Sequence, residues 1–344
     1  MMDDATDTTM DQEVDAPAPD NANIGDANAE FGVDEGSSDA SLTDGGNEVN
    51  PDVELTREIT FEQPDGTNGW EDSSSVIFNW RTASIGRDRV PDARVRMATS
   101  INVPTVVNDV TYRGDRAVRL VMEGWSSPQS FRQDLELIGN TSNGVDRRFR
   151  QGETHVVGFA MRIEHATWPG EGFQLYHQYH NPGPPKEGYG STLNPAVSLV
   201  RTSNTDLSVI LRDNRPGGER LNTTHRIEGG VRAGLWVRWV FKTRFANFDS
   251  GENGLVEVWS AEGREPLTMH FRVNDRPVGY AYEDDRDFEV VIFDMYGRPF
   301  QEDATVYIDE IRVADGDLDP SVVDPIRWTN YQHPLNHPHN DDLR

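Results

Sequence analysis

The residues best suited to chemistry lie between Phe173 and His180, which read Phe-Gln-Leu-Tyr-His-Gln-Tyr-His. Alternate side chains of a β-strand share a face, so one face is predicted to carry Gln174, Tyr176, Gln178 and His180. Tyrosine rings, amides and an imidazole on one face are suited to stacking on sugar rings and to hydrogen-bonding their hydroxyls. The opposite face, which includes His177, is expected to be buried.

Two further segments show the same division between an apolar and a polar face. In residues 131–137, Arg132, Asp134 and Glu136 alternate with apolar residues. In residues 291–298 the polar face carries Asp294, Tyr296 and Arg298. A solvated sheet face is the competing interpretation for Arg132, and an aromatic at the edge of the core is the competing one for Tyr296.

A fourth strand, over residues 236–244, places cations on one face and apolar residues on the other. Arg238 and Lys242 lie on that cationic face. Because the local field matters more to binding than the net charge, this face is predicted to suit an anionic ligand.

Taken in chain order, these segments resemble the jelly-roll polysaccharide lyases of the heparin lyase I-like, glucuronan lyase and alginate lyase groups. The resemblance rests on Arg132 to Glu136, on Gln178-Tyr179-His180, and on Asp294-Met295-Tyr296. The segments 254–259 and 306–313 also resemble the heparin lyase I-like group. The resemblance implies a concanavalin-like β jelly roll whose substrate groove lies on one sheet.

The resemblance also implies β-elimination at a uronic acid. Arg132 and Gln178 would then bind the C5 carboxylate and stabilise the charge that develops on it. His180 is a plausible base near neutral pH. Tyr296 would protonate the leaving oxygen or act as both base and acid, and the sequence leaves these assignments open. Further substrate contacts are expected from Gln174, Tyr176, Arg238, Lys242 and Arg298.

The chain departs from this pattern mildly at Asp134, where the alginate lyases have a glutamate, and more strongly at a second position. The related lyases commonly carry a lysine four residues before the tyrosine, and here that residue is Ile292. Arg298 is a candidate replacement on the same strand face.

No cofactor is expected to be required for catalysis. Many folds of this group hold a structural calcium, and its ligands would include Glu62 and Asp309.

Two other functions compete with a lyase. A glycan-binding module of the same fold would keep the polar face without needing Tyr296. A retaining glycoside hydrolase needs two carboxylates roughly 5–5.5 Å apart, for which Asp134 and Glu136 are candidates.

The composition excludes several classes of partner. The net charge is −27, and two lysines accompany thirty arginines, so nucleic acid is excluded because phosphate binding depends on cations. There is no cysteine, and hence no disulfide or thiolate nucleophile. No apolar run approaches the roughly 18–20 residues of a membrane span.

An acidic polysaccharide is the expected substrate and a monomer the expected state. We expect an extracellular or periplasmic location, although the first residues show no secretory signal pattern.

The chain divides into three parts by composition and hydrophobic pattern. Residues 1–52 hold 15 of the 59 acidic residues and none of the 32 basic ones, and are expected to be a disordered acidic linker. From residue 53 to 320, short alternating segments separated by Gly, Asn, Asp and Pro predict an all-β, two-sheet antiparallel sandwich with little helix. Residues 321–344 are expected to form an irregular tail.

Overall fold

The computed structural model describes the chain in several segments. Side chains and backbone are described for residues 107–114, 116–122, 149–165, 168, 173–181, 183–283, 288–297 and 304–326. The strands at residues 57–59, 78–84, 105–106 and 131–137 are described by their backbone pairing alone.

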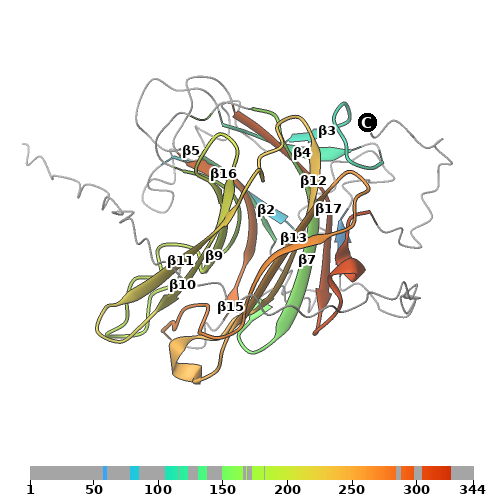
Figure 1. Cartoon of the computed structure of the whole chain (residues 1–344). Coiled ribbons are helices and arrows are strands. Elements are labelled where there is room, and N and C mark those ends of the chain that lie inside the picture. The colour runs from blue at the N-terminus through green and yellow to red at the C-terminus, as the bar shows by residue number, and fades with distance from the viewer. Residues whose placement is uncertain are drawn as a thin grey trace, which may run out of the picture. The chain divides into compact units, whose positions relative to one another are not determined.

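Two antiparallel sheets face each other across one hydrophobic core (Figure 1). Sheet A runs in the order β14 (Thr268–Val273), β13 (Leu255–Glu262), β12 (Trp236–Arg244), β7 (Thr154–Ile163), β17 (Ala304–Asp315), β4 (Ala117–Met122) and β3 (Thr105–Val107), and β1 (Arg57–Ile59) also pairs with β17. Sheet B runs in the order β11 (Arg220–Ile227), β10 (Leu207–Asn214), β9 (Val197–Arg201), β8 (Gln174–Tyr179), β16 (Val291–Gly297), β5 (Phe131–Leu137) and β2 (Phe78–Ser84). A short ladder joins β6 (Phe149–Arg150) to β15 (Phe288–Glu289). The predicted jelly-roll sandwich is confirmed.

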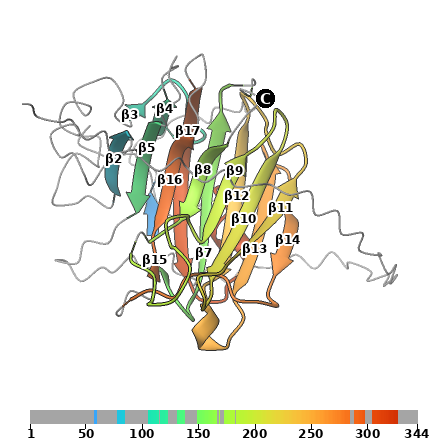
Figure 2. The same cartoon turned by 90° about the vertical axis from the view of Figure 1, so that its left-hand side faces the viewer.

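The strand order of sheet B brings together the three segments that carry the candidate site residues, which are β8, β16 and β5. Figure 2 shows this sheet from its outer side, with β8 and β16 near its middle. Because β16 lies between β8 and β5, residues that are more than 150 positions apart in the sequence become neighbours. The outer face of sheet B is therefore the place where a site can form.

Alternation decides what each strand buries. Phe159 of β7, Phe241 of β12 and Phe293 of β16 meet in the core, with the rings of Phe159 and Phe293 5.0 Å apart. Each of these residues alternates with one that faces away from the core. The core therefore fixes which side chains sheet B presents outward.

The outer face of sheet A is covered by the segment after β17. This segment contains η3, a 3₁₀ helix at Pro320–Val323, and Val322 and Val323 are buried against β7 and β12. A Cβ at Gly158 of β7 would lie 2.0 Å from the carbonyl oxygen of Val323, so only glycine permits this approach. The packed structure therefore extends past residue 320.

Helical structure is scarce in the described residues, as the sequence predicts. It consists there of η3 and of η2, a 3₁₀ helix at Phe248–Ser250. Within those same residues no helix is long and apolar enough to cross a membrane.

Candidate functional site on the outer face of sheet B

Strand β8 divides its last residues between the core and the outer face. The ring of His177 packs among Phe159, Phe241 and Phe293, with ring centroids 4.8–5.0 Å apart. Tyr179 also belongs to the core. Gln178 and His180 therefore point to the other side, where the site is expected, and the interior position of His177 is confirmed.

The amide of Gln178 is held by the carboxylate of Asp294. Its Nε2 donates to Asp294 Oδ2 over 2.7 Å, and both side chains are buried. An amide carries two N–H groups, and this bond uses one of them. The other N–H remains to donate to a ligand, in an orientation that Asp294 fixes.

The ring of His180 is oriented by a backbone carbonyl. His180 Nε2 lies 3.2 Å from the carbonyl oxygen of Thr192, in the loop between β8 and β9. A carbonyl only accepts, so Nε2 carries the hydrogen and Nδ1 keeps the lone pair in the neutral ring. The Thr192 hydroxyl in turn donates to the Gly183 carbonyl over 2.5 Å, which ties the loop to itself. The bond to Thr192 therefore fixes the orientation of the imidazole ring.

Tyr296 lies on the same face of sheet B, at a different position along it. It is partly exposed, and its ring meets Phe173 edge to face at 5.7 Å. Arg132 of β5 is its register partner. The side chain of Arg132 and all of Arg298 lie outside the described residues.

The register separates Tyr296 from His180. The backbone N–H of His180 donates to the carbonyl of Val290, six residues before Tyr296 on the neighbouring strand. At about 3.3 Å per residue, the two backbones are on the order of 15–20 Å apart along the strands. The predicted residues therefore form two groups, with Gln178 and His180 in one and Arg132 and Tyr296 in the other.

A β-bulge places Gln174 and Tyr176 in the interior, so their predicted substrate contact is wrong. Leu175 pairs with Val200 and His177 with Leu199, which leaves Tyr176 as an extra residue. The bulge shifts the alternation by one, and both side chains are fully buried, with the Tyr176 hydroxyl donating to Gln174 Oε1 over 2.8 Å. Burial raises the pKa of Tyr176.

The predicted substrate contacts of Arg238 and Lys242 are also wrong. Both lie on the outer face of sheet A, beneath the segment that follows β17. Arg238 Nη1 donates to the carboxylate of Asp324 over 2.5 Å, and Lys242 Nζ donates to the carbonyl of Leu318 over 3.0 Å. Alternation identified their shared face correctly, but the sequence does not reveal which of the two sheets that face belongs to.

The carboxylate of Asp309, a predicted calcium ligand, binds backbone amides. Its Oδ2 accepts from the N–H groups of Tyr112 and Arg113, over 2.9 and 3.1 Å. Its Oδ1 accepts from the N–H of Glu310 over 2.8 Å. The described residues contain no cluster of three or more metal-binding side chains, and Glu62 lies outside them. Asp309 thus has a structural role in joining β17 to the segment before β4.

Three residues of the site escaped the sequence analysis as functional candidates. Asp294 was recognised only as part of a polar face. Ser198 of β9 is the register partner of Gln178, and Arg212 of β10 donates to Ser198 Oγ over 3.0 Å. Alternation within β10, where Leu207, Val209 and Leu211 enter the core, would have placed Arg212 on the outer face.

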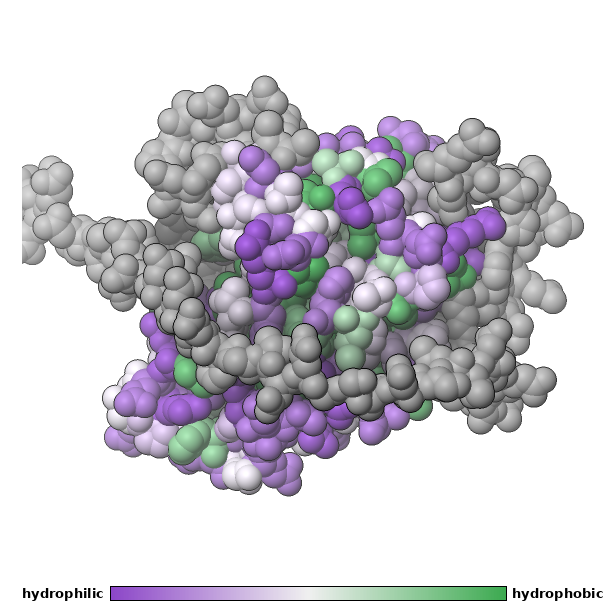
Figure 3. All heavy atoms as spheres, in the orientation of Figure 1, coloured by the Kyte–Doolittle hydropathy of each residue, from purple (hydrophilic) through white to green (hydrophobic). Residues whose placement is uncertain are grey.

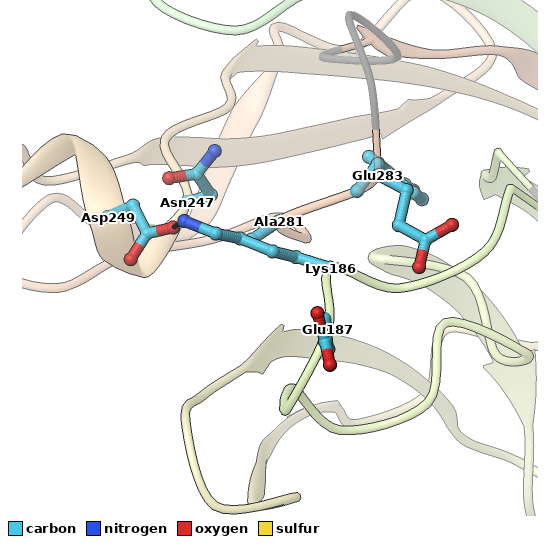
Figure 4. A pocket seen from close by; sticks show the side chains of 7 residues that line it. Lys186, Glu187, Asn247, Asp249, Ala281 and Glu283 are labelled. Atoms are coloured by element: carbon cyan, nitrogen blue, oxygen red, sulfur yellow. Dashed lines mark hydrogen bonds and ion pairs between the residues drawn. The ribbon is translucent and has the colours of Figure 1, made fainter.

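A pocket of about 520 Å³ lies near η2, lined by seven residues of three loops (Figure 4). Its single lysine, Lys186, is paired with Asp249 over 2.5 Å. Two further carboxylates, Glu187 and Glu283, also line it. This pocket is therefore unsuited to an anionic sugar.

Figure 3 shows hydrophilic residues predominating at the lower left, where the β10–β11 hairpin lies in Figure 1.

Comparisons with known proteins agree with this architecture. A family model described as polysaccharide lyase matches residues 77–312. The structure of an endo-β-1,4-glucuronan lyase from the fungus Trichoderma reesei is similar with a TM-score of 0.52 and 18% identity, over 67% of this chain and 92% of that one. The alginate lyase AlgAT5, of polysaccharide lyase family 7, gives a TM-score of 0.38 and 12% identity, over 69% of this chain and 94% of that one.

No curated protein matches this chain. The glucuronan lyase likeness shows the shared fold. The family model spans every strand of sheet B, from β2 to β16, and it includes Gln178, His180 and Tyr296. This chain belongs to the polysaccharide lyase family.

Proposed function

We propose that this chain cleaves a uronic-acid-containing polysaccharide by β-elimination, with Gln178 and His180 at the reacting sugar. The observation that supports the proposal most is their shared position on the outer face of sheet B. There, Asp294 fixes the amide of Gln178 and Thr192 fixes the imidazole of His180.

The chemistry assigns a role to each group. His180 takes the C5 proton through Nδ1, and the electrons of that C–H bond form the C4–C5 double bond as the C4–O bond breaks. Gln178 donates its second amide hydrogen to the C5 carboxylate, where negative charge develops. The leaving oxygen receives the proton that the imidazolium holds.

Tyr296 takes a different role in this proposal. Acid and base act on neighbouring atoms of one sugar, and the backbone of Tyr296 is roughly 15–20 Å from that of His180 along the strands. The aromatic pair of Tyr296 and Phe173 is instead suited to stacking on a sugar further along the polymer.

The first substrate to test is glucuronan, the polymer named for the fungal structure of similar fold. The chain is incubated with glucuronan, alginate, heparin and heparan sulfate while the ultraviolet absorbance of the unsaturated uronide is followed. We expect absorbance to rise on at least one polymer. Binding without any rise would indicate a glycan-binding module, and release of saturated sugars would indicate a hydrolase.

The substrate and the family also suggest the setting. Polymeric glycans are met outside the cytoplasm, so we infer an extracellular or periplasmic location for a monomeric enzyme. A structural calcium stays a prediction, since both oxygens of Asp309 already accept amide hydrogens. Metal analysis of the purified protein tests it directly.

A further inference from the structure

Arg212 is a partly buried cation on the outer face of sheet B. Its Nη1 donates to the carbonyl of Pro195 over 2.7 Å and to Ser198 Oγ over 3.0 Å. These two bonds fix one edge of the guanidinium. The planar group carries further donors on its other edge, in the fork that matches a carboxylate.

The pairing of β8, β9 and β10 brings Arg212 next to the proposed reaction site. Val197 pairs with Tyr179 on one side and with Leu211 on the other. His180 and Arg212 are the next residues of their strands, so one strand separates them, and their backbones are roughly 10 Å apart. Ser198, which Arg212 contacts, stands directly beside Gln178. The guanidinium thus reaches toward the same space as the amide and the imidazole.

Arg212 lacks the carboxylate partner that several other arginines of the sandwich have. In the described part of the chain, Arg226 is paired with Asp206, Arg238 with Asp324, and Arg312 with Glu310. No carboxylate lies within ion-pair distance of Arg212 in those same segments. Burial lowers the pKa of Arg212, and the positive charge of Arg220 lowers it further. A desolvated cation without a neutralising carboxylate is a favourable place for an anion.

The position of Ile292 strengthens this assignment. Ile292 is the register partner of Gln178 on the side opposite Ser198, so its side chain flanks Gln178 without charge. Arg212 lies on the other side of Gln178, on β10, which β9 separates from β8.

We propose that Arg212 binds the carboxylate of the sugar presented to His180 and supplies positive charge beside Gln178. This inference rests on the proposed function. Because the carboxylate gains charge as the C5 proton leaves, a fixed cation stabilises the transition state more than the bound substrate.

The test compares Arg212→Gln and Arg212→Lys with the wild-type chain. The substrate is the polyuronate that the wild type cleaves fastest among the four polymers named above. We expect Arg212→Gln to lower kcat/KM by about 100-fold, as for loss of one charge-stabilising donor. Arg212→Lys keeps the charge without the fork, so a smaller loss is expected.

A binding measurement separates a contact with the carboxylate from a general effect on the fold. Oligosaccharides of that polymer and their carboxyl-reduced forms are titrated calorimetrically; for glucuronan the reduced forms are cello-oligosaccharides. Arg212→Gln should weaken binding of the acidic form and leave binding of the neutral form unchanged. Thermal unfolding checks that each variant is folded. Arg226→Gln is the matched control, because Arg226 lies on the neighbouring strand and is already paired with Asp206.

The outcomes are distinguishable. If a folded Arg212→Gln variant keeps wild-type kcat/KM, or weakens neutral and acidic ligands equally, Arg212 does not bind the carboxylate. If the wild type itself cleaves none of the four polymers, the proposed function fails first and the role of Arg212 falls with it.

Discussion

At the scale of single residues, His180 and Tyr296 distinguish two versions of the chemistry. The backbone bond from His180 to Val290 places His180 away from Tyr296 along the strands, so the proposed reaction lies beside Gln178. His180→Ala should lower kcat by about 10²- to 10⁴-fold, the usual contribution of a general base, with little change in KM. Tyr296→Phe should lower kcat by less than tenfold. Steady-state kinetics on the cleaved polymer measures both.

A larger effect of Tyr296→Phe than of His180→Ala would place the reaction at Tyr296 instead of His180. If Tyr296→Phe abolished turnover while His180→Ala retained it, the phenol beside Arg132 would be the reacting group. The chemistry would then lie beside Tyr296, where it pairs with Arg132 of β5.

His177 makes stability depend on pH in a predictable direction. Burial among aromatic rings lowers its pKa to about 3, and this outweighs its contact with the Ile292 backbone. The unfolded chain binds a proton near pH 6.5 and the folded chain does not, so the stability present above pH 6.5 is lost as the pH falls toward 3. The loss approaches roughly 1.4 kcal/mol per pH unit for this one group.

The variant His177→Phe isolates that contribution. Its free energy of unfolding in urea should fall less steeply than that of the wild type between pH 6 and about 4. Other histidines, including the partly buried His165, also have lowered pKa values, so the difference between the two chains is the relevant quantity. Parallel curves for the two chains would contradict this assignment.

At the scale of elements, alternation predicted the strands that bury one face. The segments predicted at 236–244 and 291–298 correspond to β12 and β16. The sequence analysis missed β11, because its residues are mostly polar and exposed at the edge of sheet B. It also missed the bulge at Tyr176, since a single extra residue leaves no mark in composition. Pairing between strands, which the sequence does not state, decided both the wrong and the missing site residues.

The ion pair between Arg238 and Asp324 fastens the segment after β17 to sheet A. Arg238 is 1% exposed, and Arg312 Nη1 also donates to the carbonyl of Asp324 over 2.6 Å. Asp324→Ala should destabilise the fold by about 3–5 kcal/mol, because it leaves Arg238 buried without its partner.

Lys242→Met is the matched control on the same strand face. Its partner Asp317 is mostly exposed, so its loss should cost at most about 1 kcal/mol. Chemical denaturation measures both changes. Equal costs would show that the Arg238 pair contributes no more than a surface pair.

At the scale of the whole molecule, composition and strand order predicted the fold class and the family. They did not predict where the charge lies relative to the site, because the two sheets have similar sequence patterns. Residues 1–52 carry −15 of the −27 net charge, and −12 remains for the other residues. The chain is thus acidic, whereas its proposed substrate is a polyanion.

This charge relationship predicts the salt dependence of activity. Like charges slow association, and added salt screens them, so KM for the polyuronate should fall as ionic strength rises from low values. A chain lacking residues 1–52 should show a weaker dependence. Initial rates at several salt concentrations check this, and a KM that rises with salt in the full chain would mean that attraction to Arg212 and its neighbours dominates.

The extra residue at Tyr176 has a consequence for anyone who aligns this chain with distant homologues. Gln174 and Gln178 are separated by an even number of positions, yet one points inward and the other outward. Counting every second position through this strand would assign ligand contacts to interior residues. The direction of each side chain has to be read from the pairing with β9 on either side of Tyr176.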